Sequence, residues 1–173
     1  PEPLLVPGAP VASWNGMLSL DRPATVVFTS GSQGHPKAAL HSFGNHYYSA
    51  RGANANLRVR SGDRWLLALP LCHVGGLGIV FRCLLGGAAM VLPAGQPDLH
   101  DAVVETTATH VSMVGTQLRR LLDREEWDPA WRSVKAVLLG GGPVAPDLLV
   151  EARLRRLPIF YSYGLTEMAS QVT

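Results

Sequence analysis

Short apolar segments recur at a regular spacing along most of this chain, and this pattern limits the possible folds more than any other feature. Stretches with helical hydrophobic spacing separate them, and the distance from one segment to the next is roughly 20–25 residues, close to one βαβ crossover. We expect strands at 24–29, 65–69, 89–92, 110–114, 136–139 and 159–162. We expect helices at 42–56, 77–85, 98–106, 116–123 and 146–156, the first with Ser42 as its N-cap.

The expected strands are almost continuously apolar, which is typical of a parallel sheet covered by helices on both faces. The sequence therefore predicts a doubly wound, mostly parallel α/β fold. Residues 1–22 are rich in proline and are expected to form an irregular or edge segment. Ligands of doubly wound sheets bind beyond the carboxyl ends of the strands, so the loops after Thr29, Leu69, Leu139 and Ser162 should surround the site.

Composition excludes several classes of protein. The chain has 173 residues, 47% of them hydrophobic and 16% charged, which is enough apolar material for a packed core. A net charge of +2 gives no basic footprint for nucleic acid, and no apolar run approaches the ~20 residues of a membrane span. The first residues lack a signal-peptide pattern. Because Cys72 and Cys83 lack CxxC spacing, we expect no disulfide scaffold, no cysteine zinc site and a cytoplasmic location.

A segment rich in glycine and hydroxyl groups, TSGSQGHPK at 29–37, directly follows the first expected strand. Gly31 and Gly34 would let the backbone approach a ligand closely and turn its N–H groups inward. The hydroxyls can donate to phosphate oxygens, and Lys37 adds a positive charge. The segment is not a Walker A loop, because proline and alanine flank the lysine. It predicts a phosphate-binding loop, the alternative being a solvated turn.

Three further loops follow expected strands and carry candidate ligands. The run GGGP at 140–143 offers bare backbone for a flat ring, or is a tight strand-to-helix turn. The run YGLTE at 163–167 combines an aromatic face, a hydroxyl and a carboxylate. Glu167 is either an oxygen ligand for Mg²⁺ or a solvated loop residue. His73 lies just beyond an expected strand and close to Gly75 and Gly76. Taken alone it is more often a structural histidine; together with the other loops it predicts a residue on a cavity wall.

These four segments, in this order, resemble the adenylate-forming superfamily of acyl-CoA ligases, luciferases and peptide-synthetase adenylation domains. The phosphate loop of that superfamily reads TSG(S/T)TGxPK, and residues 29–37 match it at all but one fixed position. Its motif aromatic-Gly-x-Thr-Glu matches 163–167. Within the superfamily, the segments 44–50, 69–76, 137–143 and 163–170 look most like the o-succinylbenzoate–CoA ligases of menaquinone synthesis. The likeness covers residues 23–173.

The resemblance implies ATP, Mg²⁺, coenzyme A and a small carboxylic acid as the molecules that this site handles. The residues it implies for the β- and γ-phosphates are Thr29, Ser30, Gly31, Ser32, Gly34 and Lys37. Those it implies for adenine and the α-phosphate are Gly141, Gly142, Pro143, Tyr163 and Thr166, with Glu167 on Mg²⁺. Those it implies for the acyl group are His73, Gly75, Gly76, Arg82 and Ser170. His73, Thr166 and Glu167 are the expected catalytic residues.

Arg82 lies nine residues beyond His73, on the next expected helix. It is a candidate partner for the second carboxylate of an aromatic dicarboxylate, the alternative being an arginine on the helix surface. In the implied reaction a carboxylate attacks the α-phosphorus of ATP, pyrophosphate leaves, and the CoA thiol then forms a thioester. Because both the nucleophile and the leaving group are anionic, alignment and charge stabilisation should dominate, and no side-chain nucleophile is needed.

Two departures from the family pattern leave alternatives open. Gln33 stands where the family usually has Thr, which removes one hydroxyl from the phosphate loop. We expect residues 23–173 to be the central part of the large ATP- and acyl-binding domain, without the C-terminal lid domain and its lysine. The chain could instead belong to another acyl- or aryl-CoA ligase, bind nucleotide without turnover, or be a fragment without function. Sheet edges exposed by missing neighbours would favour a homo-oligomer.

Overall fold

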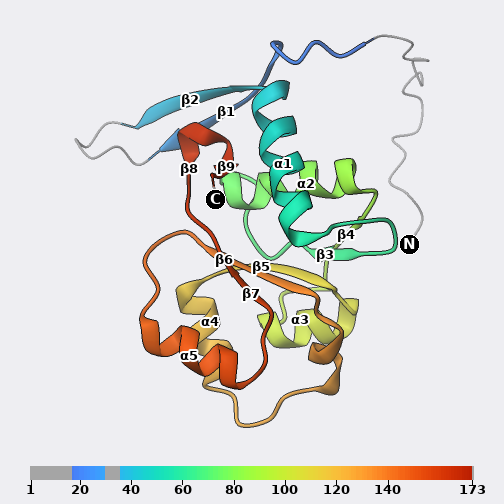
Figure 1. Ribbon diagram of the computed structural model, residues 1–173, viewed down its shortest axis with the longest axis vertical. Helices are drawn as coiled ribbons and strands as arrows, with labels where there is room; N and C mark the ends of the chain where they lie inside the picture. The colour runs from blue at the N-terminus through green and yellow to red at the C-terminus, as the bar shows by residue number, and fades with distance from the viewer. Residues whose placement is uncertain (1–16, 30–35, 173) are drawn as a thin grey trace.

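The computed structural model describes residues 17–29 and 36–172, and a parallel sheet with the strand order β4-β3-β5-β6-β7 forms its centre (Figure 1). These strands are β3 (Arg64–Leu66), β4 (Ala89–Val91), β5 (His110–Val114), β6 (Ala136–Gly140) and β7 (Ile159–Tyr161). From β3 the chain moves outward to β4 and then returns to the other side of β3 for β5. The strand order therefore reverses between β3 and β5, and their carboxyl ends form the switch point of the sheet.

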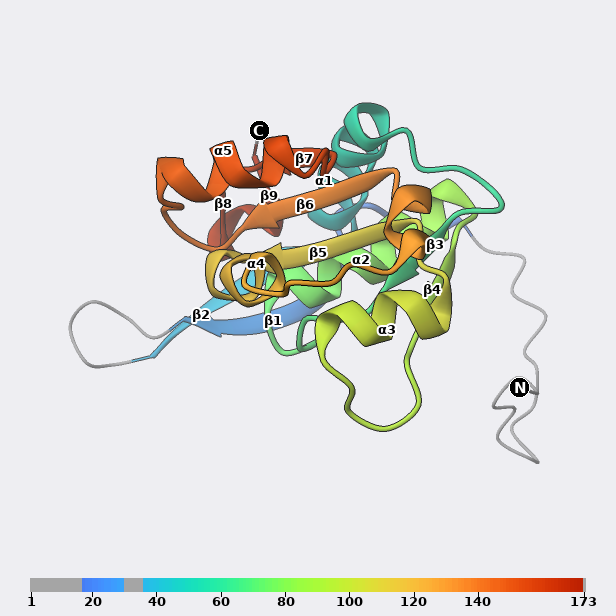
Figure 2. The same cartoon turned by 90° about the horizontal axis from the view of Figure 1, so that it is seen from below.

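Helices cover both faces of this sheet (Figures 1 and 2). One face carries α1 (Phe43–Leu57) and α2 (Val74–Gly86), and the other carries α3 (Leu99–Thr106), α4 (Gly115–Leu122) and α5 (Pro146–Leu154).

Successive side chains of a strand point to opposite faces, so each strand contributes to two cores. On β3, Trp65 packs with residues of α1 and α2, whereas Leu66 packs with residues of α3 and α4. On β6, Leu138 packs in the core with α1 and α2, and Leu139 packs in the core on the opposite face. The expectation of a doubly wound α/β fold is confirmed.

Local signals in the sequence set the ends of several helices. Ser42 caps α1 as expected: its hydroxyl accepts the N–H of Asn45 at 3.3 Å, and the Asn45 side chain accepts the N–H of Ser42 at 2.8 Å. Asp98 caps the N-terminus of α3, and Gly87 caps the C-terminus of α2 with a φ of 66°, which suits a residue without a side chain. Within the described ranges, no helix is both long and apolar enough to cross a membrane.

The first expected strand does not join the parallel sheet. Instead, β1 (Pro23–Thr29) pairs antiparallel with β2 (Lys37–Ser42), a strand that the sequence did not predict. Its sequence KAALHS is rich in alanine and runs directly into a helix cap, so it carries little β-propensity of its own. The hairpin forms because one face, with Val27 and His41, is buried against the rest of the molecule.

Near the C-terminal end, a second small antiparallel pair was also not expected from the sequence. It consists of β8 (Gly164–Leu165) and β9 (Ser170–Gln171), joined by the 3₁₀ turn η2 (Thr166–Met168). A further 3₁₀ turn, η1 (Pro129–Ser133), connects α4 to β6. The strand expected at 65–69 ends early, at Leu66, although the Leu67 N–H still donates to the Val91 carbonyl at 3.0 Å. These elements are too short for periodicity in the sequence to reveal them.

Two buried histidines fix the hairpin to its neighbours. Nε2 of His46, on α1, lies 2.8 Å from the hydroxyl of Thr25 on β1, and the imidazole stacks on Phe81 of α2 with ring centroids 4.2 Å apart. Nε2 of His41, on β2, donates to the carbonyl of Thr166 at 2.6 Å. Nδ1 of His46 has no partner among the described residues. Burial, with a smaller contribution from nearby His41, lowers the pKa of His46 from 6.5 to about 4.

The larger core should be sensitive to loss of side-chain volume. Leu118, on α4, is 0% exposed, whereas Leu154, on α5, is 78% exposed. We expect Leu118→Ala to lower the free energy of unfolding by about 2–5 kcal/mol, since it leaves a cavity. Leu154→Ala should change it by less than about 0.5 kcal/mol. Urea unfolding followed by circular dichroism checks both, and equal effects would contradict this assignment of the core.

Stability should depend on pH through His46. Its pKa is lower in the fold than in the unfolded chain, so the unfolded state binds more protons between about pH 6.5 and pH 4. Stability therefore falls as the pH drops through this window, by about 2 kcal/mol between pH 7 and pH 5. His110, whose pKa burial also lowers, acts in the same sense.

The variant His46→Gln keeps an N–H for Thr25 but cannot titrate. Urea unfolding at pH 7 and pH 5 should show a smaller loss of stability on acidification for this variant than for the original chain. An unchanged pH dependence would show that His46 is not the group responsible.

Candidate functional site

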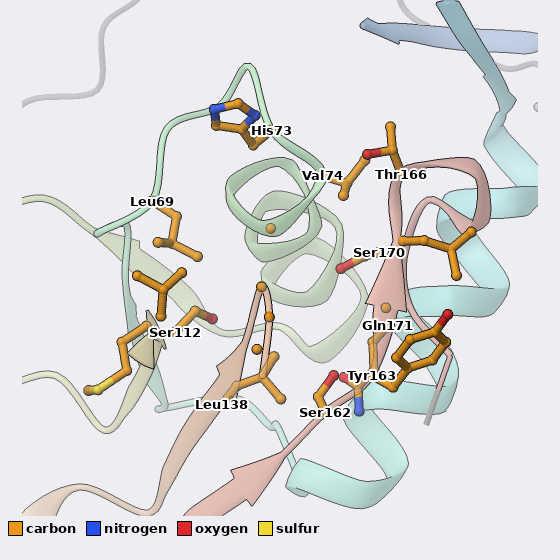
Figure 3. A pocket seen from close by; sticks show the side chains of 18 of the residues that line it. Leu69, His73, Val74, Ser112, Leu138, Ser162, Tyr163, Thr166, Ser170 and Gln171 are labelled. Carbon is orange, nitrogen blue, oxygen red and sulfur yellow. The ribbon is translucent and has the colours of Figure 1, made fainter. Parts of the chain in front are cut away.

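A cavity of about 1120 Å³ opens at the carboxyl edge of the sheet, at its switch point (Figure 3). The ends of β3, β5, β6 and β7 contribute to it, together with the start of α2 and the β8–β9 pair. Of the residues that the sequence singled out, those that line the cavity are His73, Gly75, Arg82, Gly141, Gly142, Pro143, Tyr163, Thr166 and Ser170. The loops after Leu69, Leu139 and Ser162 therefore meet at one place, as strand-end geometry requires.

One wall of the cavity is bare backbone. Gly141 has a φ of 87°, a conformation that favours glycine, and a side chain there would lie 3.0 Å from Val114. Gly142 is exposed, and its carbonyl accepts a hydrogen bond of 3.5 Å from the Tyr161 hydroxyl. Tyr163 is exposed on the same cavity. A planar ring can lie against this wall because no side chain projects from it.

The turn before α2 forms another wall. The His73 side chain is exposed at the start of α2, and the backbone N–H of His73 donates to the Pro70 carbonyl at 3.1 Å. Gly75 lies at the cavity surface, whereas Gly76 is buried beneath the turn and does not line the cavity. A Cβ at Gly76 would lie 2.2 Å from the Pro70 carbonyl oxygen, so this position requires glycine. Gly76 therefore shapes the wall from behind.

Arg82 is the most buried charge at the cavity, with 1% of its surface exposed. Its Nη2 donates to the Ser170 hydroxyl at 2.9 Å, while Nε and Nη1 have no partner among the described residues. Burial lowers the pKa of Arg82 to about 10, which still leaves the guanidinium charged at neutral pH. No carboxylate of the described chain forms an ion pair with it. The alternative of an arginine on the helix surface is wrong.

The segment from Thr166 to Glu167 lies on η2. Thr166 lines the cavity, and its carbonyl is held by His41, a residue that the sequence did not single out. Glu167 is exposed and is not among the cavity-lining residues. One exposed carboxylate suits Mg²⁺, which binds proteins through one or two carboxylates and takes its other ligands from phosphate and water. The magnesium role of Glu167 stays a prediction.

The hairpin brings the two ends of the phosphate-loop motif together. Thr29 pairs with Lys37 in the register of β1 and β2, with Thr29 half-buried and Lys37 exposed. Ser30, Gly31, Ser32 and Gly34 lie outside the described residues, as does Gln33, so their expected phosphate contacts stay predictions. The base of the motif is linked to η2 through the hydrogen bond from His41 to Thr166.

Sequence reasoning missed Ser112, which lines the cavity from β5, and Trp65, which lies behind it on β3. The strand-end rule points to β5, which flanks the switch point like β3, but it does not single out Ser112 in the middle of that strand. Trp65 carries no such signal because it lies in the core, and only the folded structure places its indole against Arg82, 5.3 Å from Cζ to the ring centroid.

Known proteins are similar to this chain in both sequence and fold. The model of the family described as AMP-binding enzyme matches residues 8–173. The 2-succinylbenzoate–CoA ligase of Bacillus velezensis is 43% identical over 157 residues, covering 90% of this chain and 32% of that relative. The o-succinylbenzoate CoA synthetase (MenE) of Bacillus subtilis, solved with the acyl-adenylate intermediate OSB-AMP, superimposes with a TM-score of 0.82 at 39% identity, over 90% of this chain and 32% of that one.

The same Bacillus subtilis enzyme solved with ATP and magnesium ion gives a TM-score of 0.81 at 39% identity, over 90% of this chain and 33% of that one. The chain thus spans about a third of the length of these relatives. The family model extends over more than nine tenths of the chain and includes every segment that forms the cavity. The chain therefore belongs to the AMP-binding enzyme family.

Proposed function

We propose that this chain forms the nucleotide and acyl pocket of an o-succinylbenzoate–CoA ligase, which converts a carboxylic acid to an acyl-adenylate and then to a CoA thioester. The observation that carries the proposal is Arg82, a buried guanidinium on the cavity wall without a carboxylate partner in the described chain. A buried, unpaired charge is costly unless a ligand neutralises it. A dicarboxylate has one group to activate and a second to pair with Arg82.

The nucleotide would occupy the side of the cavity that faces β6 and β8. Adenine would lie against the Gly141–Gly142 backbone, with Pro143 and Tyr163 beside it. The Thr166 hydroxyl would donate to the α-phosphate. The phosphate loop from Thr29 to Lys37 would hold the β- and γ-phosphates, its amide groups and lysine favouring anions.

The acyl group would occupy the side nearer α2. Its second carboxylate would pair with the Arg82 guanidinium, whose Nε and Nη1 are buried and lack partners among the described residues. Ser170 holds the third nitrogen and so fixes the direction of the guanidinium. His73 and Gly75, at the start of α2, would lie between the acyl chain and the nucleotide.

In the proposed reaction an oxygen of the substrate carboxylate forms a bond to the α-phosphorus of ATP, and the bond from that phosphorus to the bridging oxygen of pyrophosphate breaks. The CoA thiolate then attacks the acyl carbon and AMP leaves. The residues of this chain would align the carboxylate and the phosphate and stabilise the charge that develops between them. Mg²⁺, held by Glu167 and the phosphates, would neutralise charge on the leaving pyrophosphate.

We further propose that residues 23–173 are the central part of the ATP- and acyl-binding domain, since relatives three times as long match the chain over about a third of their length. Both cysteines are free thiols, which supports the cytoplasm as the compartment. Association into a homo-oligomer stays a prediction.

Pyrophosphate release by the protein in which this chain occurs tests the proposal. With ATP, Mg²⁺ and 2-succinylbenzoate, release should exceed the rate without the acid. Release only with fatty or aryl monocarboxylates would contradict the acyl assignment and favour another CoA ligase of the family. Binding of ATP with no pyrophosphate formed with any acid would identify a nucleotide-binding module without turnover.

The phosphate loop can be tested separately from the acyl site. We expect Lys37→Ala to weaken ATP binding about tenfold, because one charge-assisted hydrogen bond to the terminal phosphates is lost. AMP binding should not change, since AMP lacks those phosphates. Calorimetric titration of both nucleotides measures the difference, and Arg132→Ala, which removes an exposed charge on η1, is the control. An equal loss of affinity for ATP and AMP would contradict the assignment.

A further inference from the structure

The hairpin of β1 and β2 carries the two ends of the phosphate-loop motif, and one side chain joins it to the turn that carries Thr166. That side chain is His41, which is 1% exposed. Its Nε2 lies 2.6 Å from the carbonyl oxygen of Thr166, so this nitrogen must carry a hydrogen and donate it. Within the described ranges, this is the one hydrogen bond between the hairpin and η2. Figure 1 shows η2, between β8 and β9, lying next to the hairpin.

Strand geometry places His41 on the same face of β2 as Lys37. Ala39, between them on that face, is half-buried, whereas Leu40 on the opposite face is exposed. Lys37 lies four residues before His41, which is about 13 Å along an extended strand. Because the strand keeps this spacing fixed, any shift of η2 against His41 would change the distance between Thr166 and Lys37.

Other contacts fix the hairpin on the helices, independently of η2. Thr25, on β1, is the register partner of His41, and its hydroxyl lies 3.4 Å from Nδ1 of His41 and 2.8 Å from Nε2 of His46 on α1. The His46 ring in turn stacks on Phe81 of α2. The hairpin is therefore held by α1 and α2, and His41 connects this fixed hairpin to η2.

The turn at Thr166 does not depend on His41 for its own shape. The Thr166 carbonyl also accepts the Ala169 N–H at 3.1 Å, which closes the 3₁₀ turn, and the flanking strands β8 and β9 pair with each other. Loss of the His41 donor should therefore leave the turn formed but no longer tied to the hairpin. Only a ligand that contacts both elements at once would be affected.

We infer that His41 is a positioning residue that holds the Thr166 turn and the phosphate-loop hairpin at the separation that one ATP molecule requires. The inference rests on the proposed function, because it needs the Thr166 hydroxyl at the α-phosphate and Lys37 at the terminal phosphates. The bond that breaks when the adenylate forms lies between these two contacts, so their alignment bears directly on the reacting phosphorus. AMP would contact the Thr166 side alone and would not need the link.

Two amide substitutions separate the link to η2 from the rest of the side chain. Glutamine ends near the Nε2 position of histidine and can still donate to Thr166, whereas asparagine is shorter and ends near the Nδ1 position, on the side of Thr25. We expect His41→Asn to weaken ATP binding about fivefold and AMP binding by less than about twofold, and His41→Gln to keep both within about twofold. Calorimetric titration of each nucleotide into the full chain measures this, and Leu40→Ala, on the exposed face of the same strand, is the matched control.

A double-mutant cycle with Lys37→Ala separates positioning from a general loss of stability. If His41→Asn and Lys37→Ala acted independently, their losses of ATP affinity would multiply to about fiftyfold. If His41 keeps the lysine in register with η2, the lysine contributes less once the link is gone, and the double variant should lose only about ten- to fifteenfold. Leu118→Ala, which destabilises the core on the opposite face of the sheet, should leave the ratio of ATP to AMP affinity unchanged.

Equal losses for ATP and AMP in His41→Asn, no loss for either, or an equally large loss in His41→Gln would overturn the role of His41 and leave the proposed function standing. A fiftyfold loss in the double variant, or a changed affinity ratio in Leu118→Ala, would overturn it in the same way. An original chain that binds neither nucleotide would instead overturn the nucleotide site on which both proposals depend.

Discussion

In a parallel sheet that is covered on both faces, ligands can reach the strands only at their ends, and the pairing of β3 with β5 brings two such ends together where the strand order reverses. The chain leaves β3 for α2 on one face and leaves β5 for α4 on the other. The two chain segments therefore diverge to opposite faces at the switch point, and neither connection crosses over the ends of β3 and β5. The cavity is thus a result of chain topology, and the two hydrophobic cores can remain fully packed on either side of it.

The two faces of the sheet contribute differently to this cavity. The larger core, with α3, α4 and α5, is almost wholly apolar and serves as the support. The face toward α1 and α2 contains several buried polar side chains: Trp65 donates to Ser112, Nη2 of Arg82 donates to Ser170, and His110 lies within hydrogen-bond distance of Thr109 and the Leu57 carbonyl. Most of these buried groups have a hydrogen-bond partner among the described residues, but Nε and Nη1 of Arg82, Nδ1 of His46 and Oδ1 of Asn54 do not. Of these groups, only the guanidinium carries a charge, and it lies on the cavity wall, where the proposed carboxylate would pair with it.

Much of this organisation could be predicted from the sequence. The helices and the five parallel strands alternate at a regular spacing in the sequence, and the strand-end rule predicts that His73, Gly141 and Tyr163 lie at one site, as the cavity confirms. The β2 strand could not be predicted, because KAALHS has low strand propensity and is held by the burial of His41 against η2.

The buried network could not be predicted for a different reason. The partners of Arg82 are Ser170 and Trp65, which are 88 and 17 residues away in the chain, and no periodicity links such positions. Sequence likeness suggested a role for Arg82 but left its burial undecided. That burial is what separates Arg82 from an arginine on the helix surface, and it is a property of the folded chain alone.

The unpaired guanidinium of Arg82 also bears on the stability of the protein and on its rate of degradation. An anionic ligand that binds there, as proposed, would neutralise the buried cation and would raise the free energy of unfolding by RT ln(1 + [L]/Kd). Abundance in the cell would then follow substrate supply, since partly unfolded chains are the ones that proteases remove. One side chain would thereby link the choice of substrate to the rate at which the protein is degraded.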